Sequence, residues 1–240
     1  MAGVQGRLFN VFSAPSPDDP TSSVSHVTQI NARTGQIVRR TPFGDGTELP
    51  PFVFAAAFNS RDELFVNTLN SSPLVDAVPL LAKVDLATGL ATAVMVVDRT
   101  FTGLAFGPND ELFGVNPIDG LVHIDLAAKD ETVIGGDLVG AAIFGATPSL
   151  AFDRDGTLYA AADGLWTVDP QSGTATPVGG PSTPFSFVGL TVPPVPEPGS
   201  AAGFCIGLVF ADSRGRPLNQ PRSVVLQRLR PGGLRSDHRT

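Results

Sequence analysis

The sequence is poor in cysteine, lysine and histidine, and each shortage argues against a class of protein. Cys205 is the only cysteine among the 240 residues, so the chain has neither a disulfide framework nor a thiolate metal cluster. Residues 1–212 hold 9 Lys/Arg, of which Lys83 and Lys129 are the only lysines, against 22 Asp/Glu, a net charge of −13. An acidic body does not favour nucleic acid as a partner, because that affinity comes largely from neutralising phosphates. Residues 213–240 differ, with seven arginines and one acid.

Helical periodicity and long apolar runs are also missing. No window keeps apolar residues at helical spacing without a Gly or Pro interrupting it, and the chain holds 26 Gly and 22 Pro. The opening stretch MAGVQGRLFNVFSAPSPDDP lacks the charged and apolar regions of a secretory signal. The composition predicts many short strands joined by tight turns.

A repeated unit runs through residues 1–192. The clearest copies are residues 149–180 and 103–136, and earlier copies cover 56–97 and 8–38 with an insertion in each. Each copy predicts four short strands, the first ending in an aromatic residue and the second starting with Leu-Phe or Leu-Tyr. The aromatic residues Phe58, Phe106 and Phe152 stand 48 and 46 residues apart. A period of this length with four strands is typical of a β-propeller blade. We therefore predict an all-β fold, a β-propeller of four-stranded blades, with about four blades in this chain.

The ends of the repeat leave two arrangements open. Residues 188–192 match a first strand with no second strand after it, whereas the chain begins near Arg7 with a second strand that lacks its first. Pairing of residues 188–192 with residues 7–11 would close a four-blade ring and hide two sheet edges. The alternative is that this chain is a fragment of a larger ring.

Several polar residues invite a chemical role, and the repeat explains each of them structurally. His123 aligns with Gln29, Lys83 and Thr167, which indicates a solvated face of the third strand. His26 has no partner group in the sequence, and Trp166 is predicted to pack between sheets. Asp153–Gly156 resembles the start of a calcium loop but lacks the third acid and the distal Glu, which favours a hairpin turn. Four further residues occupy the same position at the end of the third strand in the four copies, and we call them the aligned set: Asn31, Asp85, Asp125 and Asp169.

That aligned set precedes turns of the Thr-Gly or Ser-Gly kind, where a short side chain accepts backbone N–H bonds. The copy at Lys129-Asp130 lacks the turn glycine. We predict no catalytic residue, no metal ligand and no cofactor. The resulting expectation is a protein that is not an enzyme.

Residues 193–240 are interpreted as a second region, a Pro-rich linker followed by an apolar segment and a basic tail that is disordered or a short helix. Within it, Val195, Pro196, Glu197 and Pro198 form a V-P-E-P motif that resembles the PEP-CTERM sorting signal of Gram-negative bacteria. The repeat also resembles the propeller-type ectodomains found ahead of that signal. The resemblance implies processing at Val195–Pro198 by an exosortase-type enzyme, transient membrane contact and an envelope or extracellular location. It also implies exopolysaccharide or another protein as a partner.

Two features depart from that family. The apolar run 201–211 is shorter than the roughly 20 residues that span a bilayer, and Asp212 and an Arg-rich tail follow it. A disrupted reading frame near residue 211 and a start downstream of the true signal peptide would explain both ends. Two other functions stay open. One is a propeller lactonase or hydrolase with a divalent metal in its central channel, and the other is a cytoplasmic protein-binding propeller, which the N-terminus as written favours.

Overall fold

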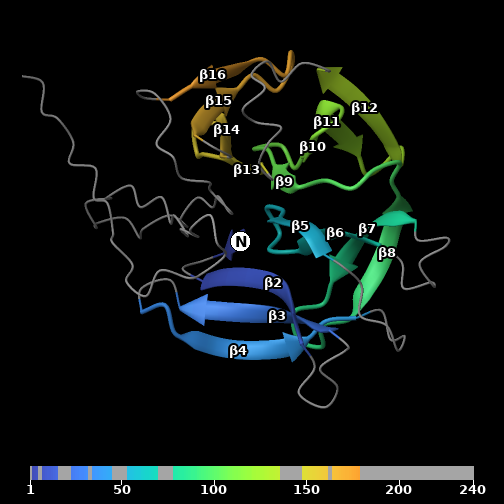
Figure 1. Ribbon diagram of the computed structural model, residues 1–240, viewed down its shortest axis with the longest axis vertical. Coiled ribbons are helices and arrows are strands. Elements are labelled where there is room, and N and C mark those ends of the chain that lie inside the picture. Colours follow the sequence, from blue (N-terminus) through green and yellow to red (C-terminus); the bar gives the residue numbers. More distant parts are fainter. Residues whose placement is uncertain are drawn as a thin grey trace, which may run out of the picture.

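The computed structural model describes residues 2–4, 7–15, 23–31, 34–44, 53–69, 78–135, 148–161 and 164–178. These residues form four antiparallel sheets of four strands each, with no helix among them. The sheets stand around a common centre as the blades of a β-propeller (Figure 1). The predicted all-β propeller of four-stranded blades is thereby confirmed for the described part of the chain.

Each blade takes its four strands in chain order, with the first strand innermost. Blade 1 contains β1 (Ala2–Val4), β2 (Arg7–Pro15), β3 (Ser23–Asn31) and β4 (Ile37–Pro42). Blade 2 contains β5 (Val53–Phe58), β6 (Leu64–Leu69), β7 (Pro79–Val84) and β8 (Ala91–Val96). Blade 3 contains β9 (Gly103–Phe106), β10 (Leu112–Asn116), β11 (Gly120–Asp125) and β12 (Asp130–Gly135). Blade 4 contains β13 (Ser149–Phe152), β14 (Leu158–Ala161), β15 (Leu165–Val168) and β16 (Ala175–Pro177).

The turn between the third and fourth strands repeats one backbone conformation in every blade. Gly35, Gly89 and Gly173 have φ values of 69°, 76° and 69° in this turn. Lys129 occupies the same position in blade 3 at φ 56°. The left-handed conformation is strained for a residue with a Cβ. The blade 3 turn, which has Lys129 in place of glycine, therefore keeps the shape of the other turns at a cost in conformational energy.

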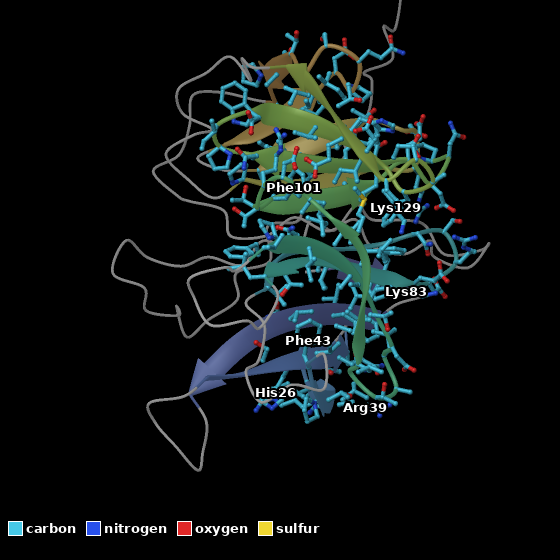
Figure 2. The ribbon with its side chains drawn as sticks, turned by 90° about the vertical axis from the view of Figure 1, so that its right-hand side faces the viewer. His26, Arg39, Phe43, Lys83, Phe101 and Lys129 are labelled. Atoms are coloured by element: carbon cyan, nitrogen blue, oxygen red, sulfur yellow. The ribbon has the colours of Figure 1, made fainter. Side chains whose placement is uncertain are left out.

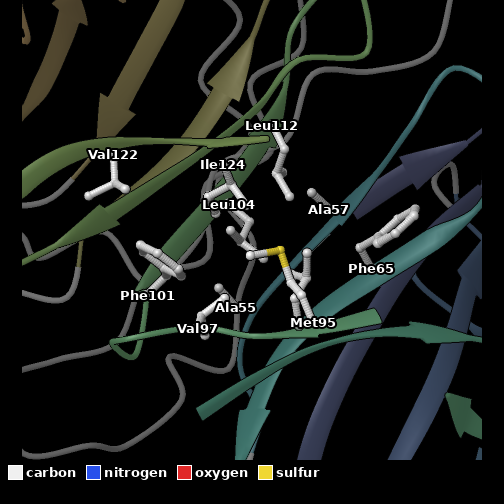
Figure 3. Packing of buried hydrophobic residues seen from close by; sticks show 11 residues of the cluster. Ala55, Ala57, Phe65, Met95, Val97, Phe101, Leu104, Leu112, Val122 and Ile124 are labelled. Atoms are coloured by element: carbon white, nitrogen blue, oxygen red, sulfur yellow. The ribbon is translucent and has the colours of Figure 1, made fainter. Parts of the chain in front are cut away.

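The hydrophobic core consists of three clusters, one at each junction between consecutive blades. Alternate residues of a strand point to opposite faces, so the sheets of blades 2 and 3 each pack one face on the blade before and the other on the blade after. In the junction of blades 2 and 3, Met95 reaches between the blades toward Leu104 and Ile124 (Figure 3). Trp166 packs in the cluster between blades 3 and 4, as the sequence predicted.

One aromatic contact recurs at all three junctions. The second-strand Phe of each blade meets the Phe that ends the first strand of the next blade, at ring-centroid distances of 5.2, 5.2 and 5.5 Å; the pairs are Phe9–Phe58, Phe65–Phe106 and Phe113–Phe152. Such tilted pairs contribute beyond their buried area. We call these three pairs the aromatic contacts. Between blade 4 and blade 1 the corresponding positions are Tyr159 and Gly3, because Gly3 pairs with Leu8 as Phe106 pairs with Leu112.

The first strand of blade 1 differs from its prediction. Ala2–Val4 pairs with β2 in the register Ala2↔Phe9 to Val4↔Arg7, so the chain supplies an inner strand ahead of Arg7. The pairing of residues 188–192 with residues 7–11 is therefore not needed to complete blade 1. Residues 188–192 and the region 193–240 lie outside the described residues.

Candidate functional site

The aligned Asn and Asp residues that end the third strands act as turn caps. Asp85 Oδ1 accepts the N–H of Ala87 at 2.7 Å, and Asp125 Oδ1 accepts those of Ala127 and Ala128 at 2.9 Å each. Asn31 and Asp169 accept the corresponding bonds in blades 1 and 4. These backbone hydrogen bonds lower the pKa of Asp125 and of Asp169. The predicted structural role of the four residues is confirmed.

The Asp153–Gly156 turn is a hairpin, also as predicted. Asp153 Oδ1 accepts the N–H of Asp155 at 3.0 Å and of Thr157 at 2.8 Å, so one of its oxygens serves the turn backbone. Among the described residues no three His, Cys, Asp or Glu side chains come close enough to hold a metal ion. Within the same ranges no helix has the length and apolar character needed to cross a membrane.

The two histidines of the described part lie on third strands. His123 is half-buried on β11, and its ring packs against Phe113 at a centroid distance of 5.3 Å. The alignment predicted a solvated face at this position, whereas the ring is half-buried against Phe113. His26 is half-buried on β3, opposite Pro42 of β4. The predicted sorting residues Val195, Pro196, Glu197 and Pro198 lie outside the described residues.

A polar network links the turns between first and second strands. Glu63 is the acceptor for Lys83 Nζ, for Asn59 Nδ2 at 2.7 Å and for Arg61 Nε at 3.2 Å. The Lys83 hydrogen bond, with those of its neighbours, lowers the pKa of Glu63 from 4.5 to about 2. Glu63 therefore stays ionised at neutral pH and serves the turn.

The same turns join blades 2 and 3. Asp110 accepts the backbone N–H of Ser60 at 2.8 Å and its hydroxyl at 2.6 Å. These two hydrogen bonds lower the pKa of Asp110. The side chain of Asp110 thus connects one blade to the next across this face of the ring.

A second inter-blade group, which the sequence did not reveal, surrounds Arg99. Arg99 leaves blade 2 and pairs with Asp119 (Nη1–Oδ2, 2.9 Å) and Glu131 (Nε–Oε2, 2.9 Å) of blade 3. The Nε–Oε2 contact is an ion pair without hydrogen-bond alignment. Burial raises the pKa of Glu131, against the opposing effects of the Asp98 N–H bond and the Arg99 charge. The group ties two blades together around a nearly buried Glu131, and its more exposed carboxylates, Asp98 and Asp119, also lie beside Arg99.

A concave site lies between blades 1 and 2. It is a hollow of about 200 Å³, and we call it the blade 1–2 hollow; its lining is Phe9, Val27, Gln29, Arg39, Thr41, Leu86 and Ala87. Phe9 and Val27 are buried and form an apolar floor, and Thr41 is 6% exposed. Arg39 Nη2 donates to the carbonyl oxygen of Ala87 at 2.6 Å, across the junction. Alignment of the repeat copies indicated only a polar residue at Gln29. It did not reveal the hollow, because the hollow depends on how two blades pack against each other.

The chain resembles several solved structures at low sequence identity. No protein-family model and no curated protein matches the chain. A gluconolactonase from Xanthomonas campestris matches with 14% identity and a TM-score of 0.48 over 77% of this chain and 65% of that one. A luciferin-regenerating enzyme matches with 10% identity and a TM-score of 0.49 over 76% of this chain and 66% of that one.

A third match is a protein of unknown function from Bacteroides thetaiotaomicron, with 14% identity and a TM-score of 0.46 over 71% of this chain and 41% of that one. The chain thus spans less than two thirds of the length of each of these structures. The prediction that the chain is not an enzyme is contradicted by these matches, which include two proteins named as enzymes, and we withdraw it. At such identities the matches speak for the fold and not for a reaction.

Proposed function

We propose that the chain is the propeller of an exported envelope or matrix protein, sorted through the V-P-E-P motif at Val195–Pro198. The observation that supports this proposal is the order of the chain. The fourth blade is finished at Pro177, and the motif, the apolar run and the basic tail all follow it. A motif after a finished domain is accessible to a processing enzyme, whereas one inside a blade is not. The proposal concerns destination and processing, and it includes no statement about catalysis.

The surface of the propeller is compatible with this destination. The body is acidic, and several of its charged side chains pair within and between blades. The partners that the resemblance implies are an exosortase-type enzyme and exopolysaccharide or another matrix protein.

The test uses the full chain behind a cleavable export signal in a Gram-negative host that encodes an exosortase. We expect the protein in the envelope or medium with a mass that shows loss of the C-terminal region. Replacing the motif with Pro196→Ala and Pro198→Ala should abolish that loss. The matched control is Pro193→Ala with Pro194→Ala, which removes two prolines of the same linker and leaves V-P-E-P intact. If the wild-type protein and both variants show the same mass and location, the proposal fails.

A lactonase or hydrolase is the second candidate, favoured by the names that two propellers of similar fold carry. The predicted metal in the central channel is not supported by the described residues, which bring no metal-binding group together. The assay is hydrolysis of glucono-1,5-lactone by the purified chain, with and without added Ca²⁺ or Mn²⁺. A rate above the buffer rate, saturating with lactone, would establish this activity. A rate equal to that of buffer at all lactone concentrations would reject it for this substrate.

A further inference from the structure

The blade 1–2 hollow is bordered by a smaller pair of residues than the one that blade 2 carries at the same positions. In blade 1 the paired residues of the third and fourth strands are Val27 and Thr41. The corresponding pair in blade 2 is Leu81 and Met95, and both belong to the cluster that fills the next junction. The smaller pair leaves space at the first junction. In blade 3 the same positions hold Leu121 and Gly135, and there the Ser172–Gly173 turn of blade 4 fills the space beside Gly135.

A cation stands at the mouth of the hollow, where the other blades carry threonine. Arg39 pairs with Gln29 in β4 and β3. The residues that occupy the position of Arg39 in the other fourth strands are Thr92, Thr132 and Thr176. Arg39 is exposed and belongs to the same side of the ring as Lys83 and Lys129 (Figure 2). The arginine is therefore a feature of blade 1 alone among the four blades described.

The guanidinium group of Arg39 is oriented but its charge is not neutralised by a described carboxylate. Its Nη2 is held by the Ala87 carbonyl oxygen at 2.6 Å, and the described ion pairs do not include it. Blade 2 offers the contrast, because Lys83, at the position of Gln29, pairs with Glu63. The position of Glu63 is occupied in blade 1 by Arg7, which removes the carboxylate that the repeat would supply.

The ligand that fits these groups is a small carboxylate. An arginine presents parallel N–H donors that match a carboxylate in geometry as well as charge. The hollow of about 200 Å³ holds the volume of roughly seven water molecules, which limits the ligand to a short carbon chain. Phe9, Val27 and Leu86 provide apolar contact for that chain, and the Gln29 amide and Thr41 hydroxyl provide polar contact.

We propose that the blade 1–2 hollow binds a small monocarboxylate, whose carboxyl group is held by Arg39 and whose short apolar body lies against Phe9 and Val27. The site lies at the circumference of the ring, between β4 and the turn that follows β7, and it is independent of the sorting motif. It is thus a binding property of the propeller that stands whether or not the protein is exported.

The test is a titration of the full chain with sodium butyrate, followed by backbone amide NMR signals. We expect saturable shifts of the amides of Gln29, Arg39 and Ala87, and no such shifts with butyramide, which has the same shape without the charge. Arg39→Gln should raise the dissociation constant about tenfold or more, as expected for loss of a charge-assisted hydrogen bond. The matched control is Arg40→Gln, because the neighbouring residue of a strand points to the opposite face. This control should leave the dissociation constant unchanged.

A second variant fills the hollow and leaves the arginine in place. Val27→Leu with Thr41→Met copies the pair of blade 2, so it should keep the protein folded and abolish butyrate binding. The proposal is overturned if butyrate shifts none of the three amides, if butyramide binds as well as butyrate, or if Arg39→Gln and Arg40→Gln weaken binding equally. The last result would mean general attraction by positive charge. Retained binding in the filled variant would also overturn it, because the ligand would then lie elsewhere.

Discussion

Alanine substitutions in the turn between the third and fourth strands test how closely blades 1 and 2 pack. Gly35 and Gly89 occupy the same position of the repeat with φ values of 69° and 76°. Replacing either with alanine imposes about 1 to 2 kcal/mol for the left-handed conformation. A Cβ at Gly35 would meet nothing within 4 Å, whereas a Cβ at Gly89 would lie 1.8 Å from the carbonyl oxygen of Pro42.

The difference between the two variants is the cost of separating the blades. The Pro42 carbonyl is backbone, so it must move by more than about 1 Å to reach an ordinary contact distance. That movement disturbs the Ala91 N–H bond to Gly44 at 2.8 Å and the Gly44 N–H bond to Gly89 at 3.3 Å. Overpacking costs about 1 to 3 kcal/mol, and each lost hydrogen bond about 1 kcal/mol. Gly89→Ala should therefore lose about 3 kcal/mol more than Gly35→Ala.

The assay is equilibrium unfolding in urea, followed by circular dichroism. Gly35→Ala should shift the midpoint slightly, Gly89→Ala should shift it strongly or prevent folding, and both should keep the same dependence on urea if both native states are intact. Lys129→Gly, at the same position of blade 3, should change the free energy of unfolding in the opposite direction. We expect an increase of about 1 kcal/mol, because glycine adopts the left-handed conformation without strain. Equal losses for Gly35→Ala and Gly89→Ala would refute the close approach of the Gly89 turn to Pro42.

Three further changes test contacts within the ring. Asn67→Ala removes the acceptor at 2.7 Å from the N–H of the fully buried Phe101 and should lower the free energy of unfolding by about 2 kcal/mol, measured in urea. Gly114→Ala places a Cβ 2.4 Å from the Phe101 ring and should cost about 1 to 3 kcal/mol, of which Phe101→Leu in the same chain should recover part. Hydrogen bonds from Ser60 lower the pKa of Asp110. Ionised Asp110 therefore contributes to the free energy of unfolding above its unfolded-state pKa near 3.8, and this contribution is lost as the pH falls through its folded-state pKa. The urea midpoint should consequently fall more steeply below about pH 4 in the wild type than in Asp110→Asn, and equal pH profiles would contradict this reasoning.

The sequence allowed the blades to be predicted because each blade is local. The turn residues, the Leu-Phe pairs and the period between Phe58 and Phe106 all belong to contacts within about 50 residues of chain, and the structure places them as predicted. Ala2–Val4 was missed because it has only three residues and ends in no aromatic residue, so nothing in it matches the repeat.

The candidate site was harder to predict for a different reason. The blade 1–2 hollow and the Arg99 group both depend on which residues of one sheet face the next sheet, and alignment of copies within one sequence does not give that register. Each site nevertheless contains a residue that differs from the aligned copies of the repeat. Arg39 lies where the other fourth strands carry threonine, and Glu131 lies where blade 2 has Ala91. Departures of this kind are where function or compensation is expected in a repeat protein.

The aromatic contacts also determine how the ring responds to mechanical force. Three junctions are joined by an aromatic pair, and among the described residues no such pair joins blade 4 to blade 1. A pull applied between residues 2 and 178 acts on blades 1 and 4 first, because these blades hold the two ends of the described chain. The end blades should then detach one at a time, each releasing roughly 160 Å of extended chain. A propeller built in this way would yield to tension in steps from its ends, while the junction of blades 2 and 3, with its buried Arg99 group, holds longest.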